Sequence, residues 1–375
     1  MTKQYSDEAV TKWASTDRRG LTAYDIAKSY DWNYAHAPEV PSAVPVPSCP
    51  GAWEFCAIPI GSPIGMPAGP LLNSRWVLYY ASLGFDVLTY KTVRSSARAS
   101  YDLPNLVPVS DASMTGAEAA VTSDANRREV ESWAISFGMP SKDPIVWQAD
   151  VEAARTQLRK DKVLVVSVVA SPQDDWTLET IAADFARCAA FARDAGADAI
   201  EANLSCPNVC TQEGSLYHSA DASGAIAAAI RARVRELPLV LKVGLFERRE
   251  QADAFVRAVS GVATAISTTN TITAVVELPG GTQLFDGARR GIGGRMIGAR
   301  CLAELRMLGA IIQQQGSGLR LIGVGGVSTA ADVADRLAAG AHHVQIATAA
   351  MLNPAVGIEI RSALARHGTR TSSSS

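Results

Sequence analysis

The stretch Ala192-Arg-Asp-Ala-Gly-Ala-Asp-Ala-Ile-Glu-Ala-Asn-Leu-Ser-Cys-Pro-Asn208 decides the fold class, because it contains the whole junction between a helix and the strand that follows. Its first residues are typical of a helix end, Gly196 predicts a turn, and the apolar run after it predicts a buried strand. Pro207 then stops strand pairing. The polar residues at this strand end are Asn203, Ser205, Cys206 and Asn208. Such a strand end predicts the floor of a site, whereas a buried cysteine without polar neighbours is usually inert.

Short apolar runs of this kind recur and alternate with helical patterns. The runs cover residues 65–68, 87–90, 163–169, 199–202, 239–243, 263–268, 319–324 and 343–347. Helices with a 3.6-residue period are predicted over 181–195, 222–235, 297–313 and 330–339. Alternation in this number predicts a closed (β/α)8 TIM barrel rather than a doubly wound sheet. A dinucleotide-binding fold would also need a Gly-x-Gly-x-x-Gly after the first strand, and none is present.

The chain is predicted to have three parts. Residues 1–58 are rich in proline and aromatic residues and predict an extended arm, residues 59–368 predict the barrel, and residues 369–375 predict a disordered tail. Connections of about 70 residues after the second strand and about 50 after the sixth are too long for plain loops, and predict lids or insertions at the active face.

The composition excludes several classes of function. Apolar residues make up 47% of the 375, and 35 Lys and Arg against 37 Asp and Glu leave no charged surface for nucleic acid or an anionic membrane. The six cysteines show no CxxC spacing, so we expect no metal site and a reduced, cytoplasmic setting. A run of about 18 apolar residues is absent, as is the apolar core of a signal peptide, so we expect no membrane span.

Lysines and amides stand at other strand ends. Lys91 and Lys242 lie among apolar neighbours, where an ammonium is costly unless it faces an anion. Either could instead be a rim lysine with only its stem buried. The sixth strand ends in Thr268-Thr-Asn-Thr271. Together these residues predict a site for a ligand that is both negatively charged and hydrogen-bonding.

The last two strands end in small residues, Gly323-Val-Gly-Gly326 and Ile346-Ala-Thr348, with Arg290-Gly-Ile-Gly-Gly294 upstream. Barrels commonly bind phosphate after these two strands, because backbone N–H groups and helix N-termini face inward there. Phosphate at this end, with lysines and amides in the middle, predicts a phosphorylated cofactor.

These residues resemble the dihydroorotate dehydrogenase family of FMN enzymes, most closely its class 1 members. The similarity runs from about Ile60 to about Ala350, and four stretches carry it: Asn203-Leu-Ser-Cys-Pro-Asn208, Gly291-Ile-Gly-Gly294, Ile322-Gly-Val-Gly-Gly326 and Gln345-Ile-Ala-Thr348. The resemblance implies an α/β barrel that binds FMN and oxidises dihydroorotate to orotate.

It also implies roles by position. Cys206 would be the general base, and Lys91 and Lys242 would act beside the pyrimidine edge of the flavin. The cofactor pocket would comprise Ala68, Gly69, Lys91, Thr92, Asn203, Lys242, Thr269, Gly294, Gly325, Gly326, Ala347 and Thr348. The substrate would be bound by Lys91, Gly138, Met139, Asn203, Asn208, Asn270 and Thr271.

The chain departs from the family pattern in several places. Ile135 stands where the family has a substrate-binding asparagine, Cys210 replaces the usual proline, and the polar arm differs from the membrane helices of class 2. The alternatives are a related FMN enzyme acting on another dihydropyrimidine-like or secondary-metabolite substrate, a barrel lyase or isomerase without flavin that uses Lys242, and a non-catalytic flavoprotein. The electron acceptor stays open, and class 1 relatives lead us to expect a homodimer.

Overall fold

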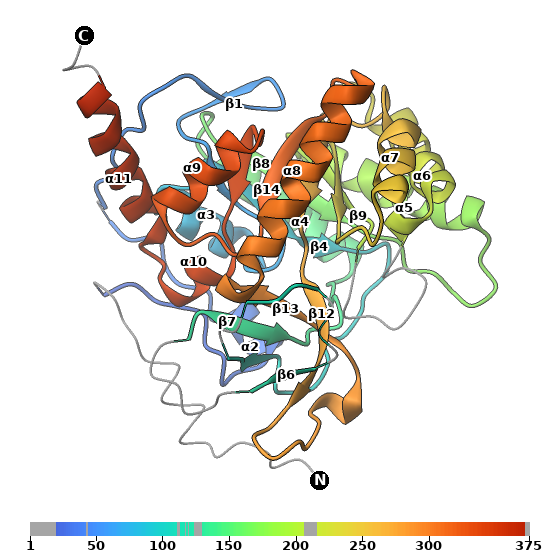
Figure 1. Ribbon diagram of the computed structural model, residues 1–375, viewed down its shortest axis with the longest axis horizontal. Helices are drawn as coiled ribbons and strands as arrows, with labels where there is room; N and C mark the ends of the chain where they lie inside the picture. Colours follow the sequence, from blue (N-terminus) through green and yellow to red (C-terminus); the bar gives the residue numbers. More distant parts are fainter. Residues whose placement is uncertain are drawn as a thin grey trace.

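The computed structural model describes residues 20–42, 44–110, 113–116, 118, 120–123, 130–205 and 216–371 of the chain. Eight parallel strands close into a barrel, and their order around it is their order along the chain. They are β3 (Ile64–Met66), β4 (Val87–Val93), β8 (Val163–Val168), β9 (Ala199–Asn203), β10 (Leu239–Val243), β11 (Ala265–Thr268), β14 (Arg320–Val324) and β15 (His343–Gln345). Each predicted apolar run supplies one strand, so the predicted TIM barrel is confirmed (Figure 1).

Helices surround the barrel (Figure 1). They are α3 (Ser74–Ser82), α4 (Pro144–Gln157), α5 (Leu178–Asp194), α6 (Ala220–Val234), α7 (Arg249–Val259), α8 (Gly298–Gln315), α9 (Ala330–Ala338), α10 (Thr348–Leu352) and α11 (Val356–Thr371). The four predicted helices correspond to α5, α6, α8 and α9. The helix α9 begins where Thr329 and Asp332 form a capping box, and α8 ends at Gly316 in a left-handed conformation. Among the described helices, none combines the length and apolarity needed to cross a bilayer.

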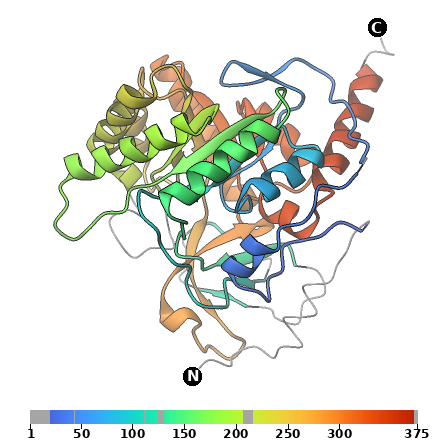
Figure 2. The same ribbon diagram turned by 180° about the vertical axis from the view of Figure 1, so that it is seen from behind.

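The two long connections build a second sheet. Its five strands run in the order β5 (Leu106–Pro108), β7 (Ser132–Ile135), β13 (Arg290–Gly294), β12 (Ile272–Glu277) and β6 (Ala120–Thr122). Two short 3-10 turns, η2 (Phe285–Gly287) and η3 (Arg295–Ile297), flank β13. This sheet lies beyond one end of the barrel in both views (Figures 1 and 2). The long connections are therefore insertions, as predicted, although their strands were not predicted.

The opposite end of the barrel is closed by a hairpin of β1 (Trp53–Phe55) and β2 (Ile58–Ile60) (Figure 1). The Phe55 ring meets the His343 ring edge-on at 5.3 Å between centroids. Burial lowers the pKa of His343 to about 3, so the imidazole is neutral at physiological pH. Gly65 has to be glycine because an added Cβ would lie 2.6 Å from His343 Nε2. This end is a packed core, which leaves the other end for chemistry.

The described part of the N-terminal arm contains a helix that was not predicted, α2 (Tyr30–Ala35). Its N-cap is Ser29, whose hydroxyl accepts a hydrogen bond from the N–H of Trp32. Side chains of α3 and of its N-cap residue Asn73 hold the arm. Among them, Trp76 Nε1 donates to the carbonyl of Asn33 at 3.0 Å, Asn73 Nδ2 to that of Tyr34 at 2.7 Å, and the Tyr79 hydroxyl to that of Thr22 at 2.9 Å. The described part of the arm is thus fastened to the barrel.

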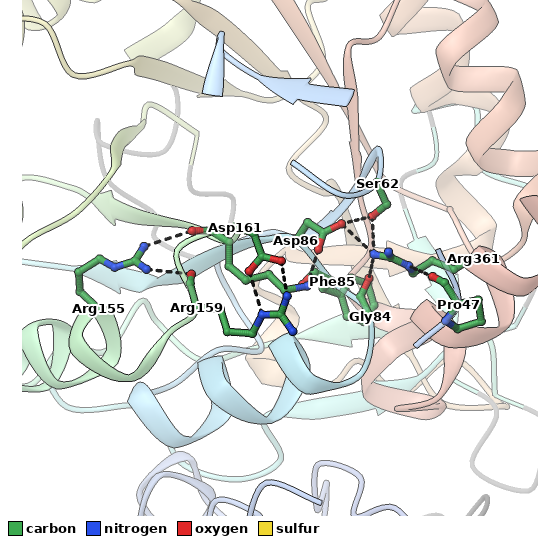
Figure 3. Close-up of polar contacts among 10 residues, drawn as sticks. Pro47, Ser62, Gly84, Phe85, Asp86, Arg155, Arg159, Asp161 and Arg361 are labelled. Atoms are coloured by element: carbon green, nitrogen blue, oxygen red, sulfur yellow. Dashed lines mark hydrogen bonds and ion pairs between the residues drawn. The ribbon is translucent and has the colours of Figure 1, made fainter. Parts of the chain in front are cut away.

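A buried charge cluster ties the arm and the C-terminal helix to the barrel (Figure 3). The carboxylate of Asp86 accepts hydrogen bonds from Ser62, Lys162 and Arg361, and the Arg361 contact is 2.8 Å. Arg361 also donates to the carbonyl of Pro47 at 2.7 Å and to that of Gly84 at 3.1 Å. One arginine of α11 therefore links the arm, the start of the first barrel strand and the loop before β4.

Replacing Asp86 by asparagine is expected to lower the free energy of unfolding by about 3–5 kcal/mol, because it leaves two buried cations without their counter-ion. The side chains of Asp86, Lys162 and Arg361 are only 3%, 9% and 8% exposed. Urea denaturation would measure the change. The matched control is Asp161→Asn, which breaks an exposed pair with Arg159 beside the cluster (Figure 3) and should cost less than about 1 kcal/mol. Equal losses of unfolding free energy for the two variants would show that the charge cluster does not stabilise the fold.

Candidate active site

A large pocket opens between the barrel and the five-stranded sheet. Its empty volume is about 1070 Å³, which includes the open space at its entrance. Its barrel side includes Asn203, Val324 and Gln345, which are the last residues of β9, β14 and β15. The pocket is therefore at the carboxyl ends of the barrel strands, where barrel enzymes have their active sites. Predicted site residues that line it are Ala68, Gly69, Lys91, Thr92, Met139, Asn203, Lys242, Asn270, Thr271, Gly294, Gly325, Gly326, Ala347 and Thr348.

Both predicted lysines are deeply buried in this pocket. Lys91 is 8% exposed, and its ammonium lies 5.6 Å from the centre of the Phe137 ring. Lys242 is 3% exposed. Neither is a rim lysine with an exposed head group. Two buried cations create a strong preference for an anionic or electron-rich ligand between the strand ends.

Lys242 has a buried partner that the sequence did not reveal. Glu201 on β9 is 1% exposed, and its Oε1 lies 4.0 Å from Lys242 Nζ. This oxygen accepts no hydrogen bond from the described residues. In the register of β9 and β10, Glu201 pairs with Val240 and Asn203 pairs with Lys242, so the carboxylate lies one step deeper in the barrel than the ammonium. Glu201 thus balances the charge of Lys242 from below the pocket.

Glycines form the opposite end of the pocket. Gly325 and Gly326 have φ of 98° and 70°, and Gly294 has φ of 103°, all in the left-handed region. An added Cβ on Gly326 would lie 2.1 Å from Gly298 Cα. From behind, Arg336 Nη2 donates to the carbonyl of Gly325 at 2.8 Å and to that of Gly298 at 3.2 Å. Because Arg336 binds the carbonyl of Gly325 from the side away from the pocket, the loop can present its backbone N–H groups to a phosphate.

Carboxamides and hydroxyls gather beside the lysines. Asn270 Nδ2 donates to Asn203 Oδ1 at 3.4 Å and also to the carbonyl of Ser205. The hydroxyl of Thr271 is buried and has no hydrogen-bond partner among the described residues. Such groups can recognise a planar ring that carries both donors and acceptors.

The remaining wall is apolar and comes mainly from the five-stranded sheet. It consists of Leu106, Trp133, Ile135, Phe137 and Met139. The alternation of Trp133 and Ile135 along β7 turns both into the pocket. The indole N–H of Trp133 is buried without a hydrogen-bond partner in the described part of the chain, which makes it a further donor available to a ligand.

Some predicted residues lie elsewhere. Thr269 is fully buried behind the pocket, where its N–H donates to the carbonyl of Val324 at 3.1 Å. Gly138 does not line the pocket but forms the turn between Phe137 and Met139. Cys206 and Asn208 lie outside the described residues. Glu201, Trp133 and Gln345 were not predicted as site residues. Gln345 is, however, the first residue of one of the four stretches that carry the family resemblance.

Fold and pocket define the class: a (β/α)8-barrel enzyme whose site combines a glycine cradle, buried lysines and carboxamides. Residues 135–367 match the family model for dihydroorotate dehydrogenase. A dihydroorotate dehydrogenase of Dictyostelium discoideum is 32% identical over 361 residues, which is 90% of this chain and 95% of the relative. The chain therefore belongs to the dihydroorotate dehydrogenase family, which is flavin-dependent, and is an oxidoreductase acting on CH–CH bonds.

Two further matches have lower sequence identity. The catalytic subunit of dihydroorotate dehydrogenase B (NAD(+)) of Pelobacter propionicus is 29% identical over 170 residues, which is 44% of this chain and 53% of the relative. The solved structure of DHODH from Eimeria tenella in complex with ferulenol covers 91% of this chain and 90% of its own, with a TM-score of 0.69 at 16% identity. That likeness concerns the fold.

Proposed function

We propose that this protein uses FMN to oxidise dihydroorotate to orotate. The observation that carries the proposal is the pocket itself, which brings together two buried lysines, a glycine cradle and a carboxamide cluster at the carboxyl ends of the barrel strands. Family membership favours this function over a barrel lyase or isomerase that would use Lys242 for a Schiff base. A cytoplasmic location and a homodimeric state stay predictions.

The described residues fit FMN. The cradle of Gly294, Gly325 and Gly326 has left-handed backbone conformations, and an added Cβ at any of the three would collide with neighbouring protein atoms, so glycine is needed to keep the loop in the shape that can turn N–H groups toward a phosphate. Two buried polar atoms of the pocket, Thr271 Oγ1 and Gln345 Oε1, lack hydrogen-bond partners among the described residues, which is expected where a polar ligand belongs. When bound, FMN accepts the hydride of the substrate.

Each group of side chains in the proposed site has a separate role in the reaction. Lys91 and Lys242 stabilise negative charge that develops at the cofactor, because they are held in a buried site where charge interactions are strong. Asn203, Asn270 and Thr271 orient the substrate ring. Cys206 removes the proton from the carbon next to the one that loses the hydride. These roles follow from the family resemblance and agree with the position of the described members in one pocket.

A second candidate is a related FMN enzyme with a different dihydropyrimidine-like substrate. The apolar wall of Leu106, Ile135 and Phe137 favours it, since the family has an amide at the position of Ile135. Losing one buried hydrogen bond would cost about 1–3 kcal/mol of binding to a substrate that carries the matching group.

The deciding experiment is the visible spectrum of the purified protein under anaerobic conditions, before and after dihydroorotate is added. We expect a flavin band that bleaches on addition, because the substrate reduces the cofactor. A band that persists would favour the second candidate, and a protein without a band would contradict the cofactor assignment.

A further inference from the structure

The loop Phe137-Gly-Met139 holds a costly backbone conformation at the mouth of the pocket. Gly138 has φ of 72° and Met139 has φ of 50°. A left-handed conformation costs a non-glycine residue roughly 1–2 kcal/mol and persists only where its surroundings fix it. The N–H of Tyr101 donates to the carbonyl of Phe137 at 3.1 Å, and Arg94 Nε donates to that of Met139 at 3.2 Å. The loop is thus held in one shape by residues of the segment that follows β4.

This loop touches two residues assigned to ligand binding. Asn203 Nδ2 lies 3.5 Å from the sulfur of Met139, within reach of a weak hydrogen bond. The Lys91 ammonium lies 5.6 Å from the centre of the Phe137 ring, a favourable cation–π distance. A shift of Phe137 or Met139 would therefore change a direct contact of Lys91 or Asn203.

The N-terminal arm packs against the outer side of this loop. The rings of Tyr24 and Tyr30 meet the Phe137 ring edge-on, with centroids 6.2 and 6.4 Å apart. Both tyrosines are 3% exposed, and burial raises the pKa of both phenols, so they pack as neutral rings. Lys142, three residues after Met139, closes the contact with an ion pair of 2.6 Å to Asp31 on α2.

The arm is itself fixed, because side chains of α3 and its N-cap residue donate hydrogen bonds to backbone carbonyls of the arm between Thr22 and Tyr34. The helix α2 lies between α3 and the five-stranded sheet (Figure 2). A continuous series of contacts therefore leads from α3 through the arm to Phe137 and from there to Lys91.

We propose that residues 20–36 form a clamp in which Tyr24 and Tyr30 position Phe137 and Met139 as the substrate-facing wall of the pocket. The tyrosines are positioning residues that determine affinity for the planar cyclic amide. The identity of that ligand rests on the proposed function; the clamp rests on the contacts above.

The test is a double-mutant cycle on the FMN-loaded protein. Tyr24→Ala and Tyr30→Ala are each made alone and together with Phe137→Ala, and orotate binding is followed through the flavin absorption spectrum. We expect each tyrosine variant to weaken orotate binding and raise the KM for dihydroorotate about tenfold, with FMN content unchanged, and to have no further effect once Phe137 is alanine. Tyr24→Phe, which keeps the ring, should bind orotate like the wild type.

The matched control is Trp32→Ala, since Trp32 lies on α2 but is 37% exposed, and its described ring contacts are with His36 and Lys28 and not with Phe137. It should leave orotate binding unchanged. Losses that persist in full without Phe137 would overturn the clamp, because the tyrosines would then act only on stability.

A wild type that binds no orotate would contradict the proposed substrate and not the clamp. In that case iodide quenching of the flavin fluorescence gives a readout that needs no substrate. The clamp requires Tyr24→Ala to increase quenching when Phe137 is present and not when it is alanine; equal quenching throughout would overturn it.

Discussion

Cys206→Ala is expected to keep the protein yellow and to slow flavin reduction by dihydroorotate about 10²- to 10⁴-fold, the usual contribution of a positioned general base. FMN should stay bound, because the variant leaves the predicted cradle and both pocket lysines unchanged. Rapid mixing under anaerobic conditions would measure the reduction rate.

The described residues just before Cys206 support its assignment as the general base. Asn203 lines the pocket and is 4% exposed, and the carbonyl of Ser205 accepts a hydrogen bond from Asn270, another residue of the pocket. The chain is thus tied to the site immediately before Cys206.

Two further variants sharpen the result. Cys206→Ser replaces the thiol by a hydroxyl, which gives up its proton less readily, and should retain part of the rate. Cys210→Ala is the matched control and should react like the wild type, since Cys210 has no role in the proposed mechanism. A Cys206→Ala protein that is reduced at the normal rate would show that another group takes the proton.

The barrel could be predicted because its strands are buried on both faces. The strand β8 shows this, as every residue from Val163 to Val168 is buried and the sequence is a nearly continuous apolar run. The five-stranded sheet could not be predicted in the same way. The strands β5 and β6 have three residues each, too few to show a period of two. Only β12 (Ile272–Glu277) alternates clearly, and its pattern lay inside a segment interpreted as an insertion.

Contacts between residues of the site were harder to predict from the sequence than the identity of those residues. Lysines, amides and glycines at strand ends are visible in the sequence, because the carboxyl ends of all barrel strands meet at one edge. The partnership of Glu201 with Lys242 depends on the register of β9 against β10, which no local pattern reports. The contact of Tyr24 with Phe137 joins residues more than a hundred positions apart and likewise leaves no local signature.

Lys242→Met is expected to weaken FMN binding about 10- to 100-fold, since a charge-assisted hydrogen bond contributes about 1.5–3 kcal/mol and each 1.4 kcal/mol is a factor of ten. The same change should lower the free energy of unfolding by about 3–5 kcal/mol, because it leaves the Glu201 carboxylate buried without its cation. Fluorescence titration with FMN and urea denaturation of the apoprotein measure the two effects separately.

The double variant Glu201→Gln/Lys242→Met separates the two roles of the lysine. It removes both charges, so we expect most of the stability to return while FMN affinity stays low, because the cofactor still lacks its cation. Lys160→Met, at an exposed position before β8, is the matched control and should change neither quantity. If the double variant regained FMN affinity together with stability, Lys242 would act by packing alone, and its place beside the cofactor would have to be given up.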